Sequence, residues 1–324
     1  MRLDRRDSLL HSALGRKEMP IILFTVLVYA GFSVMAPNFN TLNNAAVIAQ
    51  QITINGIVAL GMTIVIMIGG MDLSVGSLLS LCGVLAGMMD NAGLPVPVTV
   101  VLTLLAGTAL GAVNGLLIVK LHIPDIIVTL ATMNIFRGIA VMITRSQWIT
   151  DFSSGFLRIG SGKGGFFSVP ILLYVLLAVV FVAGLKWLPF GRLLYAVGGN
   201  REAASLMGLD VARVKVKVYM IDGFLLGLAG LLFASMFGSI QAATAATSMQ
   251  FQTMGSALIG GANIFGGGGS VLGTVFGTIL LGMIKNGLVQ IHASEYWLDF
   301  ITGTVILLAL MVNLIQIHRK KGGV

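Results

Sequence analysis

Long runs of apolar residues, many of them close to the length needed to cross a lipid bilayer, dominate this sequence of 324 residues. A membrane-spanning helix needs about 20 mostly apolar residues. Only 10% of the residues are charged and 56% are hydrophobic, whereas about a quarter are charged in soluble domains. Because lipid offers no partner to backbone N–H and C=O groups, spans must be helices or closed barrels. The runs do not alternate as barrel strands do, so the sequence predicts an all-α, polytopic membrane protein.

The apolar runs and their breaks predict about ten transmembrane helices. A single transmembrane domain, residues 20–315, lies between a basic N-terminal segment, residues 1–19, and a short tail, residues 316–324. The eighth span is short and is followed by four glycines, so a full span and a re-entrant segment both remain open. The predicted spans are 20–36, 41–70, 74–89, 96–119, 124–143, 168–188, 214–237, 251–263, 270–290 and 297–314.

Basic residues, which give the chain a net charge of +8, gather in a few short segments. With the N-terminus inside, ten spans place Lys120, most of the basic residues of 186–217 and those of 319–321 on the same side. That side is the cytoplasm by the positive-inside rule, so both termini are expected to be cytoplasmic. Segment 145–163 breaks the rule mildly, with three basic residues outside. We expect a bilayer partner and no nucleic acid.

The longest polar stretch between the late spans, residues 191–217, predicts a short helix near residues 198–209. It offers a capping asparagine, an acidic first turn, a small apolar side and a terminating glycine. A short amphipathic helix in a cytoplasmic loop suits docking to a soluble partner. A surface helix lying on lipid headgroups fits equally well. The defining residues are Asn200, Glu202, Ala203, Ala204 and Gly208.

One acidic residue, Asp72, stands in a short break between the second and third spans. A charged group near the bilayer is costly and usually serves a pathway or an ion pair. Asp72 and Ser74 also suit N-capping of the third span, while Gly76 permits close packing. We favour a helix cap at a tight turn over a solute contact, and hypothesise that the turn lines the inner part of a transport pathway.

Two polar residues, Asn134 and Arg137, fall in or near the outer half of the fifth span. An intramembrane arginine is expected to face the interior of the bundle or a partner. An ion pair and a solute contact are both open for Arg137. With Asp72, Ser74 and Gly76, these residues complete the candidate pathway. Separately, Gly107, Gly111 and Gly115 form a small-residue stripe that favours helix packing.

The segment from Tyr195 to Leu209, YAVGGNREAASLMGL, resembles the EAA-type loop of ABC importer permeases. More closely, it is similar to the ribose, xylose, galactose and arabinose permease family. The same group includes permeases for rhamnose and for the quorum signal autoinducer-2. The resemblance covers nearly the whole chain, in order. Other matching pieces are GGMDLSVGS at 69–77, Ile123-Pro124, Thr129 to Thr132, Phe136 to Gly138, Gly260-Gly261 and Gly266 to Gly269.

The resemblance implies a subunit of an importer in the bacterial inner membrane. Two permease chains, identical or paralogous, would form the pore. Cytoplasmic ATPase subunits would bind the loop helix, and a periplasmic or lipid-anchored binding protein would deliver the solute. By position, Glu202, Ala203, Ala204 and Gly208, with the cap Asn200, would form the coupling helix. The solute would be a monosaccharide or similar small polar molecule, or autoinducer-2.

Motifs that would support other functions are missing from the sequence. There is no G-x-x-x-x-G-K-[ST] phosphate loop and no HExxH metal site, and Cys82 is the only cysteine. No cofactor is therefore expected on this chain, and ATP with Mg²⁺ would bind the partner ATPase. An ion-coupled secondary transporter would want buried acidic residues in several spans, but few of the 12 acidic residues lie inside. An intramembrane enzyme would need a Ser/His or metal constellation that is not found. We expect a transport subunit and not an enzyme.

Overall fold

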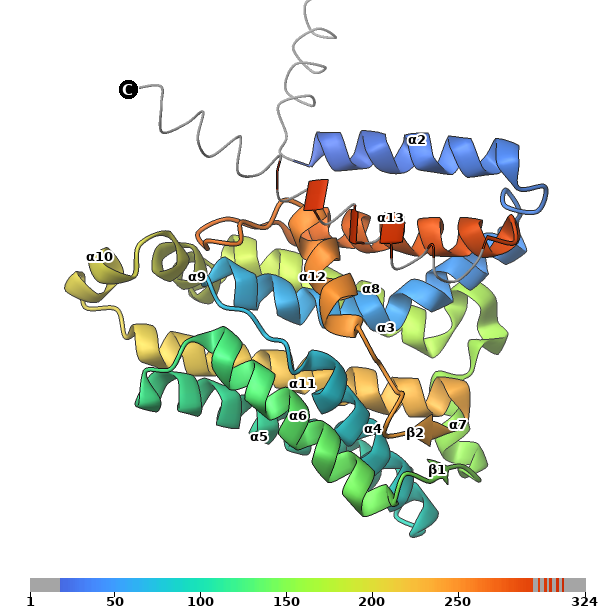
Figure 1. The fold of residues 1–324 in the computed structure, drawn as a ribbon, viewed down its shortest axis with the longest axis horizontal. Coiled ribbons are helices and arrows are strands. Elements are labelled where there is room, and N and C mark those ends of the chain that lie inside the picture. The colour runs from blue at the N-terminus through green and yellow to red at the C-terminus, as the bar shows by residue number, and fades with distance from the viewer. Residues whose placement is uncertain are drawn as a thin grey trace, which may run out of the picture.

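The fold, described by a computed structural model, is a bundle of helices (Figure 1). The description covers residues 18–293 and, beyond them, Trp297, Phe300, Ile301, Gly303, Thr304, Leu307, Leu308 and Met311. The basic segment 1–17, most of the tenth predicted span and the tail 316–324 lie outside it. The elements are α2 (Met19–Met35), α3 (Leu42–Met67), α4 (Val75–Asn91), α5 (Val96–Leu121), α6 (Asp125–Thr144), β1 (Trp148–Ile149), α7 (Ser154–Gly160), the 3₁₀ helix η1 (Gly162–Phe167), α8 (Val169–Trp187), α9 (Pro189–Gly199), α10 (Arg201–Leu206), α11 (Val211–Phe237), β2 (Ile240–Gln241), α12 (Met249–Ile259) and α13 (Val271–Gln290).

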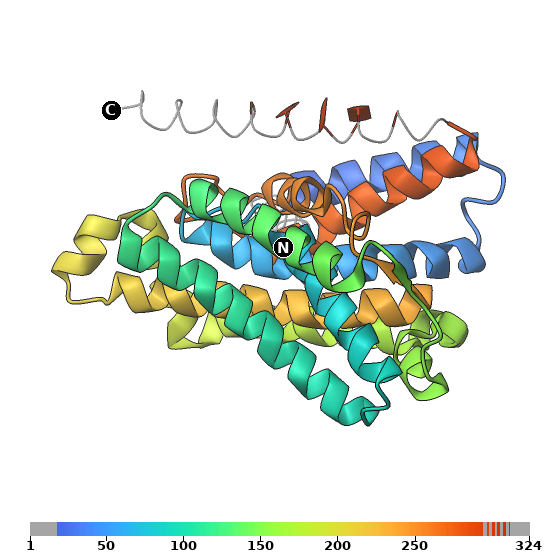
Figure 2. The ribbon, with the colours of Figure 1, turned by 60° about the horizontal axis from the view of Figure 1, so that its bottom comes forward.

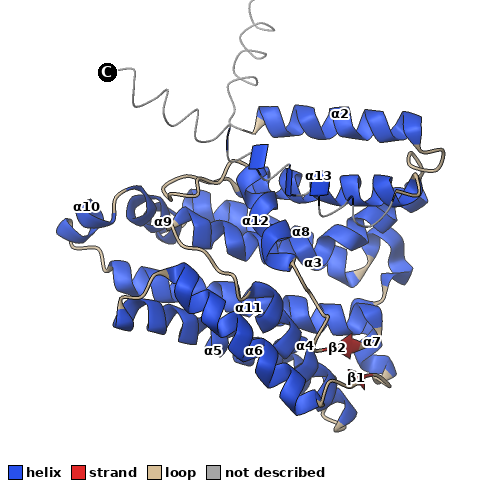
Figure 3. Cartoon of the chain, viewed as in Figure 1, coloured by secondary structure: helices blue, strands red, loops and turns tan. Residues whose placement is uncertain are grey.

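The prediction of an all-α polytopic membrane protein is confirmed. Six of the described helices, α3, α5, α6, α8, α11 and α13, are long and apolar enough to cross a membrane, and α2 and α4 are shorter apolar helices. Figure 3 shows how little of the chain is strand. For the first nine predicted spans, the ends agree with helix ends to within three residues, except for the C-terminal end of the eighth.

The helices run between two ends of the bundle (Figures 1 and 2). We call them the α10 end, where α9 and α10 lie, and the strand end, where the antiparallel pair β1 and β2 lies beside α7. Helix α11 is central and packs against α5, α4 and α3, while α13 packs against α3, α12 and α2. The buried core gathers around α3, α4 and α11.

The predicted glycine stripe on α5 packs against α11, as expected. A Cβ added to Gly107 or Gly111 would overlap backbone atoms of Gly223 or of Tyr219, and Gly227 faces the same contact. Small residues allow two backbones to approach this closely.

Two stretches of chain inside the bundle are not helical. The first is link A, residues 68–74, which joins α3 to α4. The second is leg B, residues 242–248, which precedes α12. Helix α12 has 11 residues, about 16 Å at 1.5 Å per residue, too short for a hydrocarbon core of about 30 Å.

The short helix α12 nevertheless belongs to a passage from one end to the other. Before leg B, β2 pairs with β1 at the strand end. After α12, link C, residues 260–270, reaches the α10 end, where Gly267 N donates to Met67 O at 2.9 Å. The segment of the predicted eighth span therefore combines leg B with a half-length helix, and the chain leads through them from the strand end to the α10 end.

Candidate functional site

The predicted loop helix exists and is shorter than expected. The Asn200 side chain accepts a hydrogen bond from Ala203 N at 2.9 Å and so caps α10, as predicted. Glu202 and Ala203 are exposed, whereas Ala204 is buried. Gly208 adopts a φ of 81°, which suits a glycine where the helix ends. Beyond them, the apolar side chains of Leu206 and Met207 are 89% and 72% exposed.

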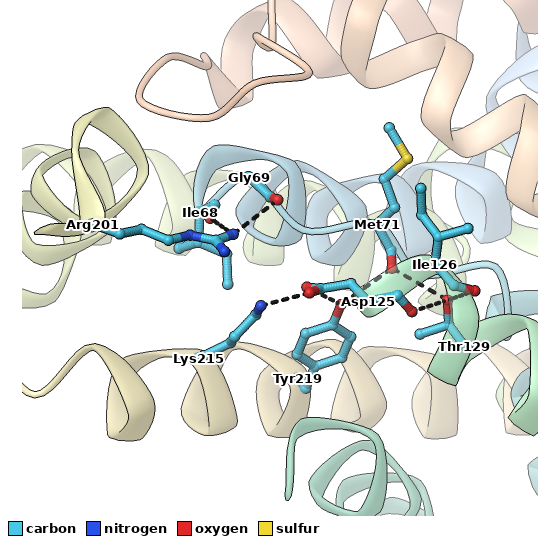
Figure 4. A network of polar contacts seen from close by, with 9 residues as sticks. All are labelled: Ile68, Gly69, Met71, Asp125, Ile126, Thr129, Arg201, Lys215 and Tyr219. Carbon is cyan, nitrogen blue, oxygen red and sulfur yellow. Dashed lines mark hydrogen bonds and ion pairs between the residues drawn. The ribbon is translucent and has the colours of Figure 1, made fainter. Parts of the chain in front are cut away.

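The elbow, residues 195–201, comprises the end of α9, Asn200 and the first residue of α10, and it contacts two links of the bundle. Arg201 Nη2 donates to Ile68 O and Gly69 O, each at 3.0 Å (Figure 4). Tyr195 OH donates to Gly269 O at 2.9 Å. Gly198 packs directly on the backbone of Met67 and of link C. The elbow therefore joins the C-terminal end of α3 to link C.

A buried ion pair lies beside the elbow at the start of α6. Lys215 Nζ of α11 contacts Asp125 Oδ1 at 2.5 Å, and the two side chains are 11% and 12% exposed. Tyr219 OH lies 2.9 Å from Asp125 Oδ2 and 3.1 Å from Met71 O (Figure 4). The network thus ties α6 and α11 to link A.

The same region holds a cavity of about 810 Å³ at the α10 end. Its lining combines charged groups with backbone of link A and with the apolar ends of α5 and α11. Among its lining residues are Gly69, Met71, His122, Asp125, Arg201 and Lys215.

Asp72 is buried and holds link A in a tight turn. Its Oδ1 accepts from Ser74 N and from Ser74 Oγ, both at 2.6 Å. Asn114 Nδ2 of α5 donates to Ser74 Oγ at 2.9 Å. The predicted N-cap geometry is therefore wrong in detail. Ser74 occupies the N-cap position of α4, but its side chain makes no cap bond and bonds to Asp72 instead.

Asp222 of α11 is fully buried beside this turn. Its carboxyl group lies within hydrogen-bonding reach of the Asp72 carboxyl, and no other described group donates to either of its oxygens. Its Oδ1 lies where a Cβ on Gly61 of α3 would be.

The other predicted pathway residues gather around leg B, with one exception. Arg137 Nη1 donates to Ala242 O at 2.6 Å and to Ala245 O at 2.8 Å. Ser80 Oγ donates to the same Ala242 carbonyl, and a Cβ on Gly76 would overlap the carbonyl oxygen of Ala246. Non-helical backbone within a membrane needs such donors. Arg137 thus bonds to backbone carbonyls, not to the acidic residue considered above.

Asn134 is the exception, since it lies on the exposed face of α6. Its side chain donates to Leu130 O of its own helix at 3.0 Å. The structure therefore joins Asp72 with Ser74, and Arg137 and Gly76 with leg B, but leaves Asn134 apart.

Sequence reasoning missed Asp125, Tyr219 and the bonds of Arg201. The signal for Asp125 was its place directly after Pro124, in the first turn of a helix, where a carboxylate is favourable. No local pattern marks its pairing with Lys215, which lies 90 residues away.

Comparison with known proteins shows that the sequence of this chain is similar to those of transport proteins. Residues 44–310 match the family described as branched-chain amino acid transport system / permease component. The ribose import permease protein RbsC of Haemophilus influenzae is 36% identical over 294 residues, which cover 89% of this chain and 90% of the relative. RbsC of Bacillus subtilis is 36% identical, over 87% and 88% of the two chains.

A third relative carries a different name. The autoinducer 2 import system permease protein LsrC of Photorhabdus luminescens is 30% identical, over 92% of this chain and 90% of its own. No solved structure matches the chain significantly.

Proposed function

We propose a solute for this chain from the family to which it belongs, that of the branched-chain amino acid transport system permease component. The chain forms the translocation pathway for a monosaccharide or a similar small polar solute. The chain is a multi-pass permease subunit of a binding-protein-dependent ABC importer in the bacterial inner membrane. It is a transport subunit and not an enzyme, and ATP is hydrolysed by a separate ATPase.

The choice of a sugar is supported by the names of the relatives. RbsC proteins, at 35–36% identity, are named for ribose import. The alternatives are autoinducer-2, from the name of LsrC, and a branched-chain amino acid, from the description of the family. A neutral polyol needs hydrogen-bonding groups and no fixed charge, and the charged groups of Asp72 and Arg137 are already bonded within the chain.

The coupling function of α10 is supported by its place and surface. It lies at one end of the bundle (Figure 1) and buries only Ala204. Exposed Leu206 and Met207 present apolar surface away from the bundle. A short helix with such a tip suits insertion into a groove on a soluble ATPase. Asn200, Glu202, Ala203, Ala204 and Gly208 then form the coupling helix.

The proposed pathway residues lie on two segments of the chain. Link A, with Asp72, Ser74 and Gly76, and the part of α6 that carries Asn134 and Arg137, border the passage. The Asp72 and Arg137 side chains hold non-helical backbone in place, while exposed Asn134 is free to face solute or a second permease chain.

The test is transport by a purified system. The permease is co-expressed with an ATPase and a binding protein from the same organism and reconstituted in liposomes. Radiolabelled D-ribose, L-leucine and autoinducer-2 are then compared in uptake driven by internal ATP. We expect uptake of the sugar that requires ATP, the ATPase and the binding protein. Uptake by the permease alone under an ion gradient would show a secondary transporter, and preference for leucine or autoinducer-2 would refute the sugar assignment.

A further inference from the structure

Among the described contacts, one charged side chain of the coupling helix hydrogen-bonds to the transmembrane bundle. Arg201 is the first residue of α10, and its guanidinium group donates to two main-chain carbonyls outside its own segment. The rest of α10 buries a single residue, Ala204. Hydrogen bonds from a charged donor are about twice as strong as neutral ones, and among the described contacts Arg201 is the one side chain of α10 that hydrogen-bonds to the transmembrane bundle.

The carbonyl groups that accept hydrogen bonds from Arg201 belong to the first two residues of link A, directly after α3. Gly69, at a φ of 68°, completes a Schellman motif, in which Gly70 N donates to Val65 O at 2.9 Å and Gly69 N to Ile66 O at 2.8 Å. The next carbonyl, Met67 O, accepts from link C. The two carbonyls that follow, of Ile68 and Gly69, accept from Arg201. The negative end of the dipole of α3 also stabilises the positive charge of Arg201 at this position.

Link A leads from these carbonyls directly into α4. It is not helical, and its Met71 carbonyl is held by the hydroxyls of Tyr219 and Thr129 (Figure 4). Five residues separate Gly69 from Val75, where α4 begins. Backbone bonds cannot stretch, so a displacement at Gly69 must be absorbed by the dihedral angles of link A or passed to α4.

The start of α4 in turn contacts the other non-helical stretch. Gly76 packs against the Ala246 carbonyl of leg B. A displacement of the first turn of α4 would therefore press on the backbone that precedes α12.

We propose that Arg201 is the positioning residue that carries movement of α10 through link A into α4. The inference rests on the proposed function, since it assumes that an ATPase moves α10. It adds the mechanical route: from the ATPase to α10, from the Arg201 guanidinium to the end of α3 and link A, and from there to α4 and leg B.

The experiment measures movement of α4 and needs no knowledge of the solute. Spin labels are placed at Met88, near the strand end of α4, and at Leu121, at the α10 end of α5, since both side chains are exposed. Native Cys82 is fully buried, so it does not compete for the label. The interspin distance is measured in the reconstituted permease–ATPase complex, without nucleotide and with ATP trapped by vanadate, together with the ATP hydrolysis rate.

The variants are Arg201→Ala, Arg201→Lys and the control Arg213→Ala. Arg213 lies in the same cytoplasmic region, is 82% exposed and pairs only locally with Asp210 in the described contacts. We expect a nucleotide-dependent distance shift in the wild type and in Arg213→Ala. Arg201→Ala should retain the bound ATPase and hydrolyse ATP but lose the shift, and Arg201→Lys should recover part of it.

Each other outcome is decisive. If α4 does not move in the wild type, or moves equally in Arg201→Ala, the route is wrong. If Arg201→Ala loses the ATPase, Arg201 is a docking residue and the inference fails. If the wild-type permease binds no ATPase at all, the proposed coupling function fails instead.

Discussion

The ion pair between Lys215 and Asp125 should contribute much more to stability than the exposed pair between Arg213 and Asp210. Replacing Lys215 by methionine leaves the Asp125 carboxylate with Tyr219 as its remaining described side-chain partner. Breaking a buried pair costs about 3–5 kcal/mol. Because these side chains are 11% and 12% exposed, we expect about 3 kcal/mol, the lower end of that range.

A double-mutant cycle isolates the pair. Asp125→Asn should cost about as much as Lys215→Met, while the double variant, which buries no unpaired charge, should cost little more than either single variant. The coupling energy is then about 2–3 kcal/mol. The matched cycle with Arg213→Met and Asp210→Asn should give about 0–1 kcal/mol, because that pair is 82% and 47% exposed.

Unfolding of the purified permease in mixed detergent micelles, followed by circular dichroism against the mole fraction of denaturing detergent, supplies the four free energies of each cycle. Equal coupling energies in the two cycles would refute the reasoning, since they would show that burial in this network gives the pair no advantage.

Three further changes test other contacts by the same unfolding assay. Gly111→Leu should cost at least about 1–3 kcal/mol, because its side chain would overlap the backbone of α11, whereas Gly138→Leu, with open space around it, should be neutral; equal effects would contradict the packing. Asp72→Asn should cost about 1–3 kcal/mol through weaker bonds to Ser74 and leave uptake per folded complex unchanged; reduced uptake at full stability would instead assign Asp72 to the solute. Asp222→Asn should stabilise the fold by about 1 kcal/mol or more, because it removes one of two carboxyl groups buried side by side and leaves an amide that can donate to Asp72; a loss of stability would show that the carboxyl of Asp222 itself is needed.

Hydropathy predicted the helices well because membrane insertion depends on local apolar length. The ends of α5 and α8 therefore lay within two residues of prediction. The Asn200 cap was predictable for the same reason, since its partner, Ala203 N, is three residues away.

Contacts between distant segments could not be predicted in this way. Leg B, with the sequence AATAATS, has no apolar run to mark it, so the need of its carbonyls for Arg137 was hidden. Likewise, Arg201 resembled one more cation of a basic loop until its carbonyl partners, 132 and 133 residues away, were known.

The glycine contact between α5 and α11 restricts which parts of this chain can move. Backbone touches backbone at Gly107, Gly111 and Gly223, so the seam holds no rotamers that could switch between two arrangements. Sliding would force one main chain over the other. During the transport cycle we therefore expect α5 and α11 to move together as one body.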